Sequence, residues 1–294
     1  MNKNILLTIF LVSVPLSSFS AQILKFSDMK MLSQQTTSEL VFDEAMNIAP
    51  NFGVNQIDPD LKPYFDPATG KSELCVPTTL SHFLIYQMGI THALPIQTNV
   101  PGVSQDLQSI DANALIVDLT KRCKTDLAKG TNGTNLMNCI GEAMQVYFGE
   151  SISIDRIMKS SNDQKYPSYV QWENRTPELA DIKNSIKNGD PVLASVNWWK
   201  IDPVTKIWTT TSGHEFMVYG YGWENYFQEN LLQLDIMDPE YNWITSTTSS
   251  DFNTEMAIRR KDLPSSSIFL DGRGFNGQVS RGYLNSLTII HIKH

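Results

Sequence analysis

The spacing of the apolar residues changes near residue 190, and this change constrains the fold more than any other feature. Before it, apolar side chains recur at helical spacing, and after it short apolar or alternating runs are separated by turn residues. The helical segments are residues 75–89, 111–127, 134–147 and 176–189. The strand segments are residues 191–199, 215–221, 231–237 and 287–292. This order predicts an α+β fold, with a helical N-terminal half packed on a mainly antiparallel sheet.

The composition is that of a globular protein rather than a disordered chain. Hydrophobic residues make up 41% of the 294 residues and charged residues 18%, which is enough apolar side chain to form a core. The net charge is -8, and the sequence has no long block of basic residues. We therefore expect neither nucleic acid nor an anionic lipid surface as a partner.

The first twenty residues have the features of a secretory signal peptide. Lys3 precedes an apolar run over residues 5–14, and Ser18 and Ser20 flank Phe19 before the expected cleavage site. The run is too short to span a bilayer, and the alternative is an N-terminal helix of the fold itself. We therefore predict a signal peptide at residues 1–20, a lead-in segment at 21–55, a domain at 56–294, and a secreted or periplasmic protein without an integral membrane segment after cleavage. The lead-in is either a propeptide or a segment packed on the domain.

Three cysteines are present, Cys75, Cys123 and Cys139. Cys123 and Cys139 lie on the apolar faces of two predicted helices, at similar distances on either side of the loop at 129–133, so an antiparallel helix pair brings them together. The sequence leaves two outcomes open, a disulfide between them or two buried thiols. Cys75 is unpaired in both.

Cys75 is also the candidate nucleophile. It opens the helix predicted over residues 75–89, and the N-terminus of a helix stabilises a thiolate. His214, at the start of the strand predicted over 215–221, is the candidate general base, and Asp238, at the end of the next strand, is the candidate carboxylate that orients the imidazole. Adjacent antiparallel strands bring these two ends close together.

The other four histidines are weaker candidates. His82 lies two helical turns from Cys75 on the same predicted helix, so we expect it to be structural. His92 falls in a predicted loop, and His291 and His294 are expected to belong to a C-terminal tail.

Four segments resemble the bacteriocin-leader (double-glycine) peptidase superfamily, which has a papain-like fold. They are Cys-Val-Pro-Thr-Thr from Cys75, Gly-Asp-Pro-Val-Leu-Ala-Ser-Val from Gly189, Gly-His-Glu-Phe-Met-Val-Tyr-Gly-Tyr from Gly213, and Leu-Asp-Ile-Met-Asp-Pro from Leu234. The resemblance covers residues 56–239 in order. It implies that Cys75, His214 and Asp238 form a catalytic triad, and that the protein needs no metal or organic cofactor.

The sequence departs from the family pattern at two positions. Val76 stands where members usually have glycine after the nucleophile, and this bulkier side chain is expected to narrow the substrate slot. Members also carry a glutamine shortly before the nucleophile, which donates a hydrogen bond to the oxyanion. The resemblance leaves Gln56 as the candidate for that role, although it precedes Cys75 by 19 residues, farther than the family pattern expects.

The predicted function is that of an exported cysteine peptidase, which cleaves peptide or amide bonds in a peptide or protein through a thioester intermediate. Two alternatives remain. One is a secreted binding or interaction protein on the same fold with little or no turnover. The other is a thiol acyltransferase or amidase, which shares the first half of the reaction.

Overall fold

The computed structural model describes residues 55–91, 109–201, 208–226, 229–237 and 280–292, together with the short stretches 23–25, 44–45, 103–104, 204, 239, 254–258 and 269–272. The predicted signal peptide at residues 1–20 lies outside the described residues, as does most of the lead-in segment at 21–55. Among the described residues, no helix is long and apolar enough to cross a membrane.

The four helical segments predicted from the sequence are confirmed. They are α2 (Cys75–Thr91), α3 (Ala112–Arg122), α4 (Gly133–Phe148) and α5 (Leu179–Asn188), preceded by a short 3-10 helix, η1 (Pro59–Tyr64). Local chemistry sets their ends. The Asp111 carboxylate accepts a hydrogen bond from the Ala114 N–H at the start of α3, and Gly189 ends α5 with a φ of 80°.

The four predicted strand segments are also confirmed, within a larger sheet. They correspond to β7 (Val192–Ile201), β8 (Trp208–Tyr226), β9 (Glu229–Met237) and β12 (Ser280–Ile292). The other strands of this sheet are β2 (Glu44–Ala45), β5 (Ile152–Met158), β6 (Val170–Glu173), β10 (Thr254–Ile258) and β11 (Phe269–Gly272). A separate small sheet contains β1 (Ile23–Lys25), β3 (Val103–Ser104) and β4 (Ser109–Asp111).

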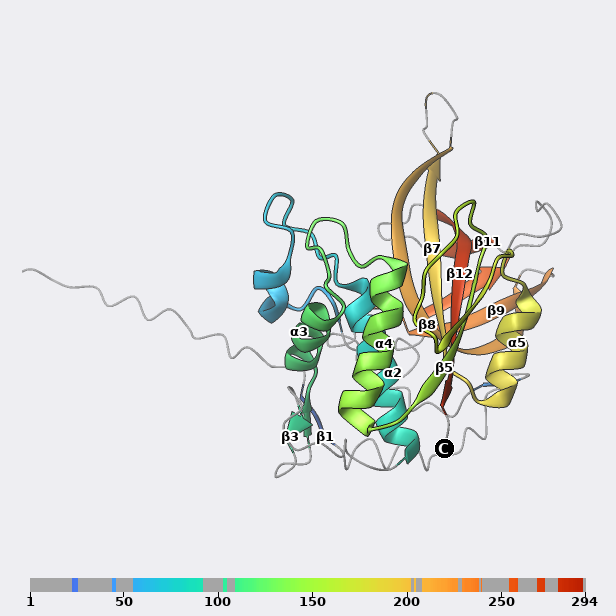
Figure 1. Ribbon diagram of the computed structural model, residues 1–294. Coiled ribbons are helices and arrows are strands. Elements are labelled where there is room, and N and C mark those ends of the chain that lie inside the picture. Colours follow the sequence, from blue (N-terminus) through green and yellow to red (C-terminus); the bar gives the residue numbers. More distant parts are fainter. Residues whose placement is uncertain are drawn as a thin grey trace, which may run out of the picture.

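The large sheet has the order β11-β10-β9-β8-β7-β12-β5-β6, and β2 pairs with β8 beside it. All of these pairings are antiparallel except that of β5 with β6. Because β11 also pairs with β12, the strands from β11 to β12 form a closed ring of pairings. Figure 1 shows α2, α3 and α4 along one flank of the sheet and α5 along the other. The fold is therefore α+β, as predicted.

The core forms where the helices meet the sheet. Phe83 and Leu84 of α2, Tyr147 of α4 and Phe216 of β8 are all completely buried. Burial of such side chains contributes about 1.5–3 kcal/mol each. The helical and strand halves therefore share one apolar core, which fixes α2 against β8.

Cys123 and Cys139 form the disulfide that the sequence left open. Their sulfurs are 2.02 Å apart and their Cα atoms 4.7 Å apart. Cys123 follows the last residue of α3, and Cys139 lies on the buried face of α4. The bond therefore joins the two helices across the loop between them.

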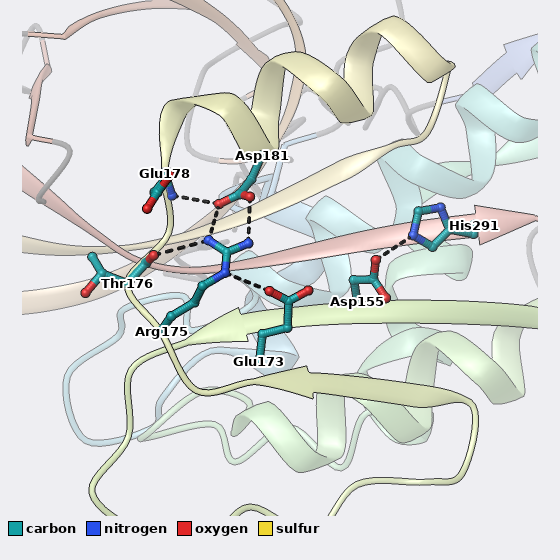
Figure 2. A network of polar contacts seen from close by, with 7 residues as sticks. All are labelled: Asp155, Glu173, Arg175, Thr176, Glu178, Asp181 and His291. Atoms are coloured by element: carbon teal, nitrogen blue, oxygen red, sulfur yellow. Dashed lines mark hydrogen bonds and ion pairs between the residues drawn. The ribbon is translucent and has the colours of Figure 1, made fainter.

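His291 is not part of a terminal tail, contrary to the prediction. It lies in β12, where Nδ1 is 2.9 Å from Asp190 Oδ2 and Nε2 is 3.0 Å from Asp155 Oδ2. Figure 2 shows His291 beside Asp155 of β5. Partial burial lowers the pKa of His291, but hydrogen bonds to the two carboxylates and their charges outweigh this effect, so its pKa lies above the ordinary value.

A second polar network joins β6 to α5, and Figure 2 shows Arg175 at its centre. The Arg175 guanidinium makes two hydrogen bonds to Asp181, at 2.7 and 2.8 Å, and a third to Glu173, at 2.7 Å. Asp181 also accepts a hydrogen bond from the Glu178 N–H at the start of α5. The network thereby fixes the loop that leads from the sheet into this helix.

We expect loss of the disulfide to lower the free energy of unfolding by about 3 kcal/mol, because the bond closes a loop of 16 residues in the unfolded chain. The test is urea denaturation of the Cys123→Ser/Cys139→Ser variant, with Cys75→Ser as the control for a single cysteine replacement. An unchanged unfolding midpoint in the double variant would contradict this expectation.

The His291 network predicts a pH-dependent stability. A histidine whose pKa is raised by folding stabilises the protein. This stabilisation is complete below the pKa of the unfolded state, about 6.5, and is lost as the pH rises through the pKa of the folded state. His291→Gln should therefore destabilise the protein most in mildly acidic solution and progressively less at alkaline pH. Denaturation across this range measures the effect, with Asp155→Asn as a second variant that should weaken the same pH dependence. A His291→Gln penalty that does not vary with pH would refute it.

Candidate active site

Cys75 lies where the sequence predicted it, at the first residue of α2. Its side chain is half-buried, and it is the free cysteine of the described chain. The following residue, Val76, is 5% exposed and packs in the core. The Val76 side chain therefore packs into the core; whether it also narrows a substrate slot stays a prediction.

His214 lies in β8, opposite Val196 of β7 and directly after the exposed Gly213. His214 is 7% exposed. Its ring packs beside Phe216, the next residue on the same face of the strand, with the ring centroids 6.2 Å apart. The imidazole is thus held within the protein near the start of the buried part of β8.

A hydrogen bond joins α2, one turn after Cys75, to the residue after His214. The Thr79 hydroxyl donates to the backbone carbonyl of Glu215 at 2.8 Å. Thr79 follows Cys75 by four residues, so the two lie on the same face of α2, about 6 Å apart along its axis. The structure therefore brings the elements that carry Cys75 and His214 into direct contact near both residues.

Strand β9 stops short of this contact. The pairing of β9 with β8 runs from Tyr226 to Met217, which lies opposite Met237 at the end of β9. The end of β9 is thus three residues from His214 along β8, as the antiparallel arrangement predicts. Asp238 follows immediately but lies outside the described residues, so its assignment as the orienting carboxylate stays a prediction.

Gln56 is brought to the same region by two hydrogen bonds of its backbone. Its N–H donates to the carbonyl of Pro239 at 2.9 Å, and its carbonyl accepts from the Ser72 hydroxyl at 2.8 Å. Pro239 follows Asp238, and Ser72 precedes Cys75 by three residues. Gln56 is 2% exposed. The 19-residue separation from Cys75 is therefore compatible with a place beside the nucleophile, because the chain returns to it.

The remaining histidines are not brought to this site by the described structure. His82 is 1% exposed within α2, as expected for a structural residue. His92 and His294 lie outside the described residues. No group of three or more histidine, cysteine, aspartate or glutamate side chains within the described residues is arranged to hold a metal ion.

A buried polar row next to the candidate site was not predicted from the sequence. It crosses four neighbouring strands on one face of the sheet, and its members are Glu215, Ser195, Ser286, Thr288 and Arg156. The Ser195 hydroxyl donates to the Glu215 carboxylate, and the Arg156 guanidinium donates to the Thr288 hydroxyl. Glu215 Oε1, Arg156 Nε and Ser286 Oγ are buried without a partner among the described residues.

Glu215 and Arg156 are the two charged residues of this row. Burial raises the pKa of Glu215, while the charge of Arg156, the hydrogen bond from Ser195 and the charge of His214 act in the opposite direction. The feature of the sequence that could have indicated this row is Glu215, a charged residue in a run that is otherwise suited to a buried strand. Strand alternation places Glu215 on the face opposite to His214, so it contributes charge near the imidazole without lying beside its ring.

No protein-family model matches the sequence, and comparison with curated proteins found no match.

We expect Arg156→Met to lower the free energy of unfolding, because it removes the hydrogen bond to Thr288 and the positive charge that opposes the burial-driven rise in the pKa of Glu215. The double variant Arg156→Met/Glu215→Gln should recover part of this loss. Urea denaturation of the two single variants and the double variant gives the coupling energy. Strictly additive effects would show that the two charges do not stabilise each other.

Proposed function

We propose that the protein is an exported cysteine peptidase with a papain-like fold, in which Cys75, His214 and Asp238 form the catalytic triad. The observation that carries the proposal is the hydrogen bond from Thr79 to the Glu215 carbonyl, because it joins the helix that begins with the thiol to the strand that carries the base. A peptide or protein is the substrate.

The reaction begins with transfer of the Cys75 proton to His214. The thiolate attacks the carbonyl carbon of the substrate, and the resulting tetrahedral intermediate collapses as His214 returns the proton to the leaving amine. Water, activated by the same imidazole, then attacks the thioester, which releases the acid and restores the thiol. Asp238 holds the imidazole in the required tautomer throughout.

Two donors are available for the oxyanion of the tetrahedral intermediates. The backbone N–H of Cys75 lies at the start of α2, where the helix leaves its first N–H groups free for a ligand. The Gln56 side-chain amide is the second donor, a role supported by the hydrogen bonds of its backbone to Pro239 and Ser72. Loss of one such donor typically slows catalysis by about 100-fold to 1000-fold.

Export rests on the predicted signal peptide at residues 1–20. The disulfide between Cys123 and Cys139 supports it, because structural disulfides are typical of oxidising compartments such as the periplasm and the cell exterior.

We expect Cys75 to react with iodoacetamide near neutral pH at least about tenfold faster than a cysteine in an unstructured peptide, and His214→Ala to abolish this difference. Peptide mass spectrometry across a range of pH measures the rate. Cys75 is the expected target because Cys123 and Cys139 are bonded to each other. His291→Gln, which removes a histidine from another part of the sheet, is the matched control.

An ordinary Cys75 reactivity, or one that does not depend on His214, would reject the triad and favour the binding protein of the same fold. If the thiol is reactive, cleavage of a denatured protein mixture, compared with a Cys75→Ala control, separates a peptidase from an acyltransferase or amidase. Internal peptide bonds are cut only in the first case.

A further inference from the structure

The geometry points to Thr79 as a residue that positions Cys75 relative to His214. This inference rests on the proposed function and adds to it a residue outside the triad and the oxyanion site. Thr79 is completely buried, and its hydroxyl hydrogen bond crosses from the helical half of the molecule to the sheet.

The hydrogen bond fills a gap in the strand pairing. The described pairing of β8 with β9 ends where Met217 lies opposite Met237, so Glu215 lies two residues beyond the last described pair. The Thr79 hydroxyl donates to the buried carbonyl of Glu215 at this position.

This contact fixes the position of α2 along β8. A shift of the helix by part of a turn would break this buried hydrogen bond. Cys75 lies one turn before Thr79 and moves with it, while His214 adjoins the accepting residue. Misplacement of reacting groups by about 1 Å can slow a reaction by about 100-fold, so a bond that prevents such movement affects the chemistry as well as the packing.

The neighbouring residue provides a matched control. Thr78 is also completely buried, but its hydroxyl oxygen has no hydrogen-bond partner among the described residues. Thr78→Val and Thr79→Val therefore make the same chemical change at adjacent positions of α2. Only the second change removes a bond between the helix and β8.

The experiment measures the rate of Cys75 alkylation by iodoacetamide as a function of pH in the full mature chain and in the variants Thr79→Val, Thr79→Ser and Thr78→Val. We expect Thr79→Val to slow the reaction near neutral pH by about tenfold or more and to move its pH profile toward that of an unstructured peptide. Thr79→Ser keeps the hydroxyl and should retain the original profile, as should Thr78→Val. Near-ultraviolet circular dichroism and the urea midpoint verify that each variant is folded, and Thr79→Ala replaces Thr79→Val if valine prevents folding.

Three results would overturn the inference. Thr79→Val and Thr79→Ala with the original pH profile would show that the hydroxyl does not position the pair, while the proposed function would stand. An equal loss in folded Thr78→Val would assign the effect to packing of the helix. Ordinary reactivity of Cys75 in the unmodified protein would reject the proposed function, and the positioning role would fall with it.

Discussion

The packing of α2 against β8 is the contact on which the rest of the molecule depends. It joins the helical half to the sheet through a buried apolar core, with Phe83 on the helix and Phe216 on the strand. Apolar packing alone tolerates sliding of one element along another, because burial depends on area rather than on direction. The Thr79 hydrogen bond is directional, and it supplies the register that the apolar contact lacks.

The large sheet supports this contact from both sides. Strand β8 is paired with β7 along one edge and with β9 along part of the other, and the closed ring of pairings holds all three strands in place. The described pairing of β9 with β8 ends at Met217, and Thr79 of α2 bonds to β8 two residues beyond it. The chain after β9 then reaches Gln56 through Pro239. The candidate site thus forms where the sheet is interrupted, and the continuous part of the sheet serves as its rigid base.

Buried charge is the main electrostatic cost of this arrangement. Glu215 and Arg156 lie on the sheet face opposite His214, within a row of hydroxyl groups from neighbouring strands. A buried charge without compensation destabilises a fold strongly, whereas a compensated pair is close to neutral. Burial raises the pKa of Glu215 and the charge of Arg156 acts against this shift, so the row holds an acidic side chain one residue from the proposed base.

The sequence by itself determined four helices and four strands of the core and the positions of Cys75 and His214 on them, because periodicity and end signals are local. It also reduced the cysteines to two pairing outcomes. It did not predict β5, since Arg156 stands at a buried position and interrupts the alternation of this short strand, and it assigned His291 to a tail. Tertiary structure alone decided that α2 meets β8 at Glu215, that Gln56 returns beside Pro239, and that Arg156 lies in one row with Glu215. Each of these contacts joins residues distant in sequence, and such contacts are set by packing of whole elements, which no local pattern contains.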